Sequence, residues 1–137
     1  MTHALTTMGI SALTVDLDRG RCLYSELFVQ GQSPFEALPF GDGAFDVAIV
    51  CMCLHHIPAE SHARIIGDLL RVSRRGVLVV EEDPEVANWC RFTNGNLLRN
   101  RGRWHRRREE WEQLLEAPAQ PWLDSTREFA IHVAKPS

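Results

Sequence analysis

The sequence has 137 residues, of which 45% are apolar, and its formal net charge is -3. This length predicts one domain over residues 1–137 with a sizeable core. The charge gives no general attraction for nucleic acid or anionic membranes, and no stretch approaches the roughly 20 apolar residues of a membrane span, so we expect neither partner. The N-terminus has no basic start and no strong apolar run, so we expect no secretory signal.

Four cysteines lie along the chain without the spacing of a disulfide framework: Cys22, Cys51, Cys53 and Cys90. A core of this size can stabilise the fold without cross-links. We therefore expect reduced thiols and a cytoplasmic protein.

The first expected elements are two short strands and a turn. Residues 10–17 (ISALTVDL) and 27–31 (LFVQG) are rich in β-branched and aromatic residues, which predicts strands. Residues 38–45 (LPFGDGAF) contain one proline and two glycines, which predicts a turn.

Two continuous apolar runs follow the turn. Residues 47–54 (VAIVCMCL) and 77–80 (VLVV) do not alternate between apolar and polar, which predicts central parallel strands buried on both faces. Between them, residues 61–73 place their isoleucines and leucines on one side, which predicts an amphipathic helix. We expect Gly76 to end this helix.

The C-terminal part predicts one more helix and a last strand. Residues 108–117 (REEWEQLLEA) have the apolar spacing of a helix, and residues 125–136 that of a strand, which could form an antiparallel hairpin with residues 121–124. Strands that alternate with helices, together with non-alternating apolar strands, predict the α/β class with a mostly parallel sheet.

The segment CMCLHHI, residues 51–57, holds two cysteines and two histidines, so it raises the question of a metal site. On a strand, alternate residues would lie on one face, roughly 6–7 Å apart. A zinc site usually needs four ligands, and the second pair would have to come from residues that form no compact motif: Cys22, Cys90, His62 and His105. We therefore expect no metal here, and interpret the segment as the end of a buried strand.

Residues 35–57 (FEALPFGDGAFDVAIVCMCLHHI) are followed by a helix and by residues 71–83 (RVSRRGVLVVEED). This combination resembles the class I S-adenosylmethionine-dependent methyltransferases, in particular the small-molecule group that includes ubiquinone and menaquinone enzymes. Residues 104–115 are similar to a late helix of that family. The resemblance implies a Rossmann-like sheet with flanking helices, S-adenosylmethionine as cofactor and a small-molecule methyl acceptor.

The resemblance also implies roles for the residues at the end of the 47–54 strand, because ligands of open α/β sheets bind at the carboxyl ends of the strands. Cys51, Met52 and Leu54 would lie beside the methionine part of the cofactor. His55 or His56 would face the substrate, as a general base, since imidazole exchanges protons near neutral pH. The alternative is a histidine that only shapes the pocket.

Three further positions are implied as cofactor contacts. Asp16 would accept hydrogen bonds from the ribose hydroxyls, although an acid there could instead cap a turn or a helix. Gln32 occupies the place where the family often has an aspartate that accepts from the adenine amino group. Phe35 would stack on the adenine or belong to the core.

One feature of the family is missing from this sequence. The family's first strand ends in a glycine-rich loop, which lets the backbone approach the cofactor, whereas the nine glycines here are scattered. Residues 4–9 resemble the end of the helix that follows that loop. We therefore expect a sheet that is incomplete at the N-terminus, with apolar edges open to pairing with another chain as a homo- or hetero-oligomer.

These observations leave two functional hypotheses. The first is a methyltransferase that acts on a small molecule. The alternative is a non-catalytic, degenerate domain that binds a partner chain. Residues 91–108 hold seven arginines, but the flanking glutamates and the negative net charge argue against a nucleic-acid binder.

Overall fold

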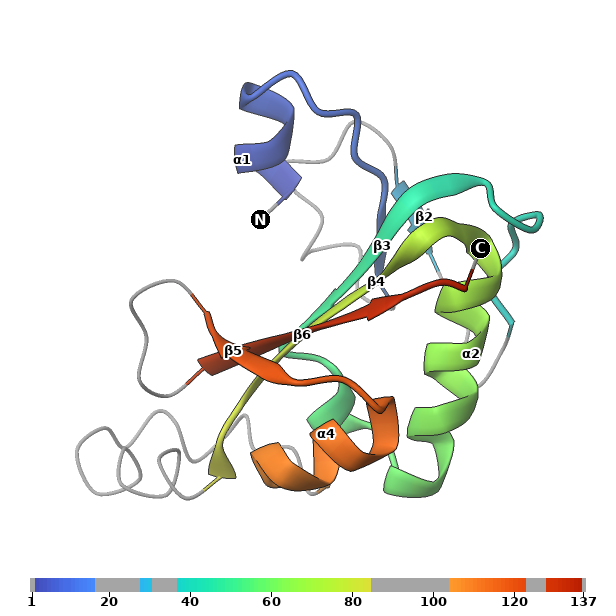
Figure 1. Ribbon diagram of the computed structural model, residues 1–137. Helices are drawn as coiled ribbons and strands as arrows, with labels where there is room; N and C mark the ends of the chain where they lie inside the picture. Colours follow the sequence, from blue (N-terminus) through green and yellow to red (C-terminus); the bar gives the residue numbers. More distant parts are fainter. Residues whose placement is uncertain (1, 17–27, 31–36, 85–103, 123–127, 137) are drawn as a thin grey trace. The chain divides into compact units, whose positions relative to one another are not determined.

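The computed structural model describes residues 2–16, 28–30, 37–84, 104–122 and 128–136, and it divides into two compact units, residues 1–36 and 37–137 (Figure 1). Of the arginine-rich residues 91–108, the structure describes those from Trp104 onward. In the described part of the chain, no helix is long and apolar enough to cross a membrane.

The first unit contains one helix and two paired strands. Helix α1 (Thr2–Thr7) ends near Gly9, whose φ of 77° is the left-handed conformation typical after a helix. Strands β1 (Thr14–Asp16) and β2 (Phe28–Gln30) pair in parallel. The helix overlaps the helical end expected at residues 4–9, and both strands lie within the predicted ones.

The second unit is built on a four-stranded sheet with the order β3-β4-β6-β5. The strands are β3 (Phe45–Cys51), β4 (Ser73–Glu82), β5 (Ala119–Pro121) and β6 (Glu128–Ala134). β3 and β4 are parallel, whereas β6 runs antiparallel to both β4 and β5. The α/β class and the antiparallel C-terminal strand are therefore confirmed. The hairpin partner of β6 lies at 119–121 rather than at 121–124.

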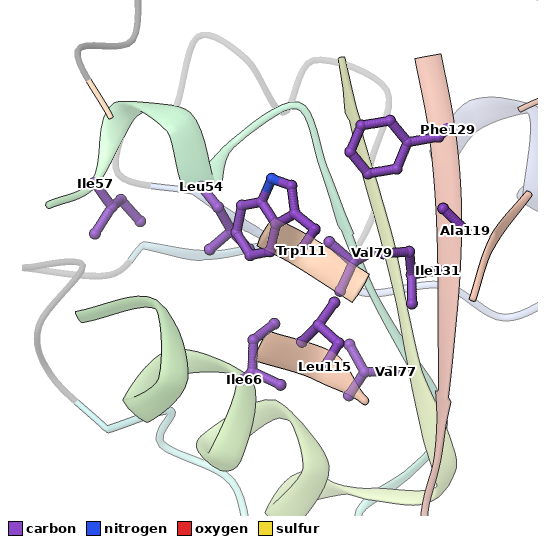
Figure 2. Close-up of a cluster of buried hydrophobic side chains, with 10 residues drawn as sticks. All are labelled: Leu54, Ile57, Ile66, Val77, Val79, Trp111, Leu115, Ala119, Phe129 and Ile131. Carbon is purple, nitrogen blue, oxygen red and sulfur yellow. The ribbon is translucent and has the colours of Figure 1, made fainter. Parts of the chain in front are cut away.

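Helices cover one face of this sheet. They are the short 3-10 helices η2 (Leu54–His56) and η3 (Ala59–Ser61), and the α-helices α2 (His62–Val72) and α4 (Arg108–Leu115). Figure 2 shows apolar side chains of η2, α2 and α4 facing those of β4 and β6. This core cluster consists of Leu54, Ile57, Ile66, Val77, Val79, Trp111, Leu115, Ala119, Phe129 and Ile131.

Gly76 does not end a helix, so that prediction was wrong. α2 ends at Val72, and Gly76 lies inside β4 with a φ of 146°. A Cβ atom at this position would lie 2.3 Å from the carbonyl oxygen of Val133 on β6. The glycine therefore permits a close approach of two antiparallel strands, a requirement that arises only once β6 has paired with β4.

β3 is buried on one face only in the described structure, and not on both faces as predicted. Ala48 and Val50 pack against the core, but the side chains of Val47 and Ile49 are 43% and 38% exposed. β3 lies at the edge of the four-stranded sheet, where β4 is its only partner among the described strands. A continuous apolar run does not distinguish such a strand from a central one.

Candidate functional site

The chain leaves the sheet sharply at the carboxyl end of β3. Cys51, the last residue of the strand, pairs with Val80, and the backbone N–H of Met52 donates to the Val80 carbonyl at 2.8 Å. Met52 has a φ of 51°, a left-handed conformation that costs a non-glycine residue roughly 1–2 kcal/mol. Backbone strain of this kind gathers at functional sites, where the surrounding structure enforces it.

Glu81, in β4, stabilises the turn that follows β3. Its side chain is only 1% exposed. Oε1 accepts the backbone N–H groups of Cys53 and Leu54 at 3.2 and 2.8 Å, and Oε2 accepts Nδ1 of His55 at 2.6 Å. Three donors compensate the burial of the carboxylate, which would otherwise be costly. Glu81 had no role in the predictions from the sequence; the signal that could have identified it is an acid directly after the apolar run of residues 77–80.

The two histidines proposed as catalytic differ in their surroundings. His55 is 5% exposed. Its Nδ1 donates a hydrogen bond to Glu81, because a carboxylate only accepts. In the neutral ring, Nε2 then carries the lone pair. His56 is exposed, with its ring centroid 4.3 Å from that of His55. Of the two, only His56 is exposed.

A third histidine joins this pair from the segment before α4. The ring of His105 stacks on His55, with centroids 4.7 Å apart and an interplanar angle of 7°. Burial, and next the neighbouring His55, lower the pKa of His105 below its usual value. From the sequence, His105 was considered only as a possible additional ligand of a zinc site that we did not expect, since about 50 positions separate it from His55.

The arginine-rich segment contributes a structural contact beside this site. Arg106 donates from Nε to Nδ1 of His62 at 3.1 Å and from Nη2 to the carbonyl of Ala59 at 3.0 Å. The backbone N–H of Trp104 donates to the carbonyl of His55 at 3.2 Å. Residues 104–106 are therefore bound to η2 and to the region around η3.

His62 belongs to the core rather than to a ligand site. It is fully buried, its Nε2–H is shared by the carbonyls of Leu54 and Ile57 at 2.8 Å each, and its ring stacks on Trp111. Both ring nitrogens are thus occupied, Nδ1 by the donor Arg106. A metal ligand needs a free lone pair, which His62 does not offer.

The residues expected to hold the cofactor fall into three groups. Cys51 and Met52 are half-buried at the end of β3, whereas the side chain of Leu54 is fully buried in the core. Burial, Glu81 and Glu128 raise the pKa of the Cys51 thiol. Asp16 is the last residue of β1, in the first unit, where the backbone pairs with Gln30. The last group, Gln32 and Phe35, lies outside the described residues.

The family described as "Methyltransferase domain" matches residues 1–80, which is more than half of the chain. No curated protein sequence matches the chain.

Several solved structures share the fold. A SAM-dependent methyltransferase from Archaeoglobus fulgidus is 13% identical with a TM-score of 0.70, over 96% of this chain and 79% of that one. A SAM-dependent methyltransferase from Methanosarcina mazei is 16% identical with a TM-score of 0.69, over 98% and 86%. The magnesium protoporphyrin IX methyltransferase from Synechocystis PCC 6803, solved with bound SAH, is 13% identical with a TM-score of 0.67, over 98% and 68%. At these identities the likeness concerns the fold.

Proposed function

The chain belongs to the methyltransferase-domain family, and on that premise we propose that it binds S-adenosylmethionine and transfers the methyl group to a small-molecule acceptor. Binding would take place at the carboxyl ends of the parallel strands, where open α/β sheets bind their ligands. The observation that carries this proposal is the strained turn at Met52, which Glu81 holds in place through the backbone of the next two residues. Such a preorganised loop suits a site that must position two reactants.

The side chains around this turn are suited to contact with the cofactor. Cys51, Met52 and Cys53 place three sulfur-bearing side chains, each at least partly exposed, at the end of β3. Soft, polarizable side chains suit contact with the methionine part of the cofactor. Asp16, at the end of β1, would accept from the ribose hydroxyls, and Gln32 and Phe35 would contact the adenine. The cofactor itself supplies the activated methyl group on its sulfonium.

His56 is our candidate for contact with the methyl acceptor. It is exposed next to the turn, whereas His55 is buried and held by Glu81. A hydrogen bond from an acceptor hydroxyl to His56 would orient the oxygen toward the methyl group, and alignment of the reacting atoms supplies much of the rate in such displacements. His55 would help to position His56, since the two rings are in contact.

One observation favours the second candidate, a domain that binds a partner chain. Within the described sheet β3 is an edge strand, and it exposes Val47 and Ile49. An apolar edge strand of this kind can pair with a strand of another copy or of a different protein. Sedimentation velocity would test this directly: a Val47→Lys variant should remain monomeric at concentrations where the unchanged chain associates.

Calorimetric titration with S-adenosylmethionine and with its demethylated product tests the main proposal. We expect micromolar binding of both. Asp16→Asn should weaken binding by about 10–100-fold, because hydrogen bonds to a charged acceptor contribute about 1.5–3 kcal/mol. Asp46→Asn is the matched control, since Asp46 is an exposed carboxylate near the amino end of β3.

A folded chain that binds neither compound would overturn the proposal of a cofactor site. If Asp16→Asn and Asp46→Asn reduced the affinity for S-adenosylmethionine equally, Asp16 would not be a contact of the ribose. With an acceptor in hand, His56→Ala should lower kcat/KM while cofactor affinity stays unchanged. An unchanged kcat/KM would show that His56 does not contact the acceptor.

A further inference from the structure

A cluster of three potential metal ligands lies at the carboxyl ends of β3 and β4. His55, Glu82 and His105 each offer one ligand atom, and these atoms all lie within 4.8 Å of one another. The three residues come from η2, from the end of β4 and from the segment before α4, all within the second unit. Two imidazoles and one carboxylate form a common ligand set of catalytic zinc sites, in which a fourth position stays open.

His55 is already oriented as a metal ligand would be. Its Nδ1 donates to Glu81 at 2.6 Å, which leaves the lone pair on Nε2. Among the described residues, no hydrogen bond to Nε2 is found. A carboxylate that receives the second N–H of a ligating histidine is the usual outer partner in metal sites, where it sets the tautomer and the ring orientation.

The geometry needs only side-chain adjustment to enclose an ion. With bonds of about 2.0–2.1 Å, the ligand atoms of a tetrahedral zinc site lie about 3.3 Å apart. The upper limit of 4.8 Å on the present separations is therefore about 1.5 Å wider than such a site needs. Glu82 and His105 are half-buried. His105 would have to turn out of its stack on His55 so that both lone pairs point to one centre.

The surroundings of His105 are consistent with this role. The backbone of the preceding residue is bound to His55, so the segment that carries His105 is held beside the other ligands.

We propose that His55, Glu82 and His105 bind a divalent transition-metal ion of the zinc class, with Glu81 as the outer partner of His55. This ligand set differs from the cysteine and histidine combinations considered from the sequence, where no metal was expected. Ion binding does not depend on methyl transfer, so either proposal can fail without the other.

Titration of the full chain with Co²⁺ tests this proposal. The chain is prepared without a histidine tag, treated with a chelator and dialysed, and Co²⁺ is then added while the visible absorption is recorded. We expect one equivalent to bind with the d–d bands of a four- or five-coordinate site, and Zn²⁺ to displace it. His105→Ala and Glu82→Gln should each weaken binding by at least about tenfold.

Matched controls separate this cluster from general surface binding. His132 and Glu60 are exposed residues outside the cluster, so His132→Ala and Glu60→Gln should leave the Co²⁺ affinity unchanged. Circular dichroism checks that each variant is folded. The proposal is overturned if the unchanged chain binds no stoichiometric Co²⁺ or Zn²⁺, or if His105→Ala and Glu82→Gln bind as well as the controls. Strong near-ultraviolet thiolate bands would also overturn it, because the ligands would then include cysteine.

Discussion

The two ends of the β3–β4 pair use carboxylates in different ways. At the amino end, Arg74 and Asp46 form an ion pair at 2.8 Å in which the side chains are 60% and 72% exposed. At the carboxyl end, the buried carboxylate of Glu81 accepts three hydrogen bonds from the turn and from His55. Water screens the first pair and supplies alternative partners. Water does not reach the buried carboxylate of Glu81 to replace its partners, so this residue controls the conformation of the candidate site.

Between these extremes lies Asp68 on α2. Its Oδ2 accepts the backbone N–H of Leu38 at 2.6 Å, and its Oδ1 accepts Nε of Arg71 at 2.7 Å. Arg71 in turn donates to the carbonyls of Leu38 and Phe40. The pair therefore attaches the turn before β3 to α2. The comparison predicts that the stability cost of removing each carboxylate increases with its burial and with the number of donors that it satisfies.

Removal of Glu81 should have the largest effect. Glu81→Ala would remove the acceptor of the backbone N–H groups of Cys53 and Leu54 and of Nδ1 of His55. We expect a loss of about 3–5 kcal/mol in the free energy of unfolding, because Leu54 and His55 are buried. Urea denaturation measures this loss. Glu81→Gln, which keeps one acceptor oxygen, should cost less. A loss below about 1 kcal/mol for Glu81→Ala would contradict the role of Glu81 as the anchor of the turn.

Removal of the Asp68 charge should have an intermediate effect that depends on pH. Burial opposes ionisation of Asp68, but the N–H of Leu38 and the guanidinium of Arg71 outweigh it, and the pKa is lowered. Because the folded-state pKa is below the unfolded one, the ionised group stabilises the fold above the unfolded value, and this contribution is lost as the pH falls through the folded value. Asp68→Asn should therefore cost about 1–2 kcal/mol at pH 7.

Denaturation at a series of pH values checks this dependence. The difference between the unchanged chain and Asp68→Asn should shrink once the pH falls below about 4. Asp42→Asn is the control, because Asp42 is 82% exposed. A difference that stays constant down to pH 3 would show that Asp68 acts through packing rather than through its charge.

Disruption of the exposed pair at the amino end should have the smallest effect. A double-mutant cycle of Arg74→Ala and Asp46→Ala should give a coupling below about 1 kcal/mol. Added salt should reduce this coupling further, since exposed charges are screened. A coupling as large as the cost of Glu81→Ala would invalidate the comparison between the two ends of the strands.

The elements of the second unit were largely predictable from local patterns. The apolar stripe of α2, the spacing in α4 and the apolar runs of β3 and β4 identified these elements to within a few residues, because the period of apolar residues reflects which face is buried. Resemblance to the methyltransferase family, carried by residues 35–83, was confirmed by the family match. It also directed attention to the end of β3, where the candidate site lies.

The contacts that make this end of the sheet a candidate site depend on the tertiary structure. Glu81 and His55 are 26 residues apart, and His105 lies about 24 residues from Glu81 and about 50 from His55, so no local period relates them. The need for glycine at Gly76 follows from the approach of β6, and the exposure of Val47 follows from its place on the face of β3 that does not pack against the core. Local sequence determined which segments form helices and strands, since propensity and periodicity act within a few residues. Strand pairing decided which charged and polar side chains meet, because only pairing brings distant segments within hydrogen-bonding distance.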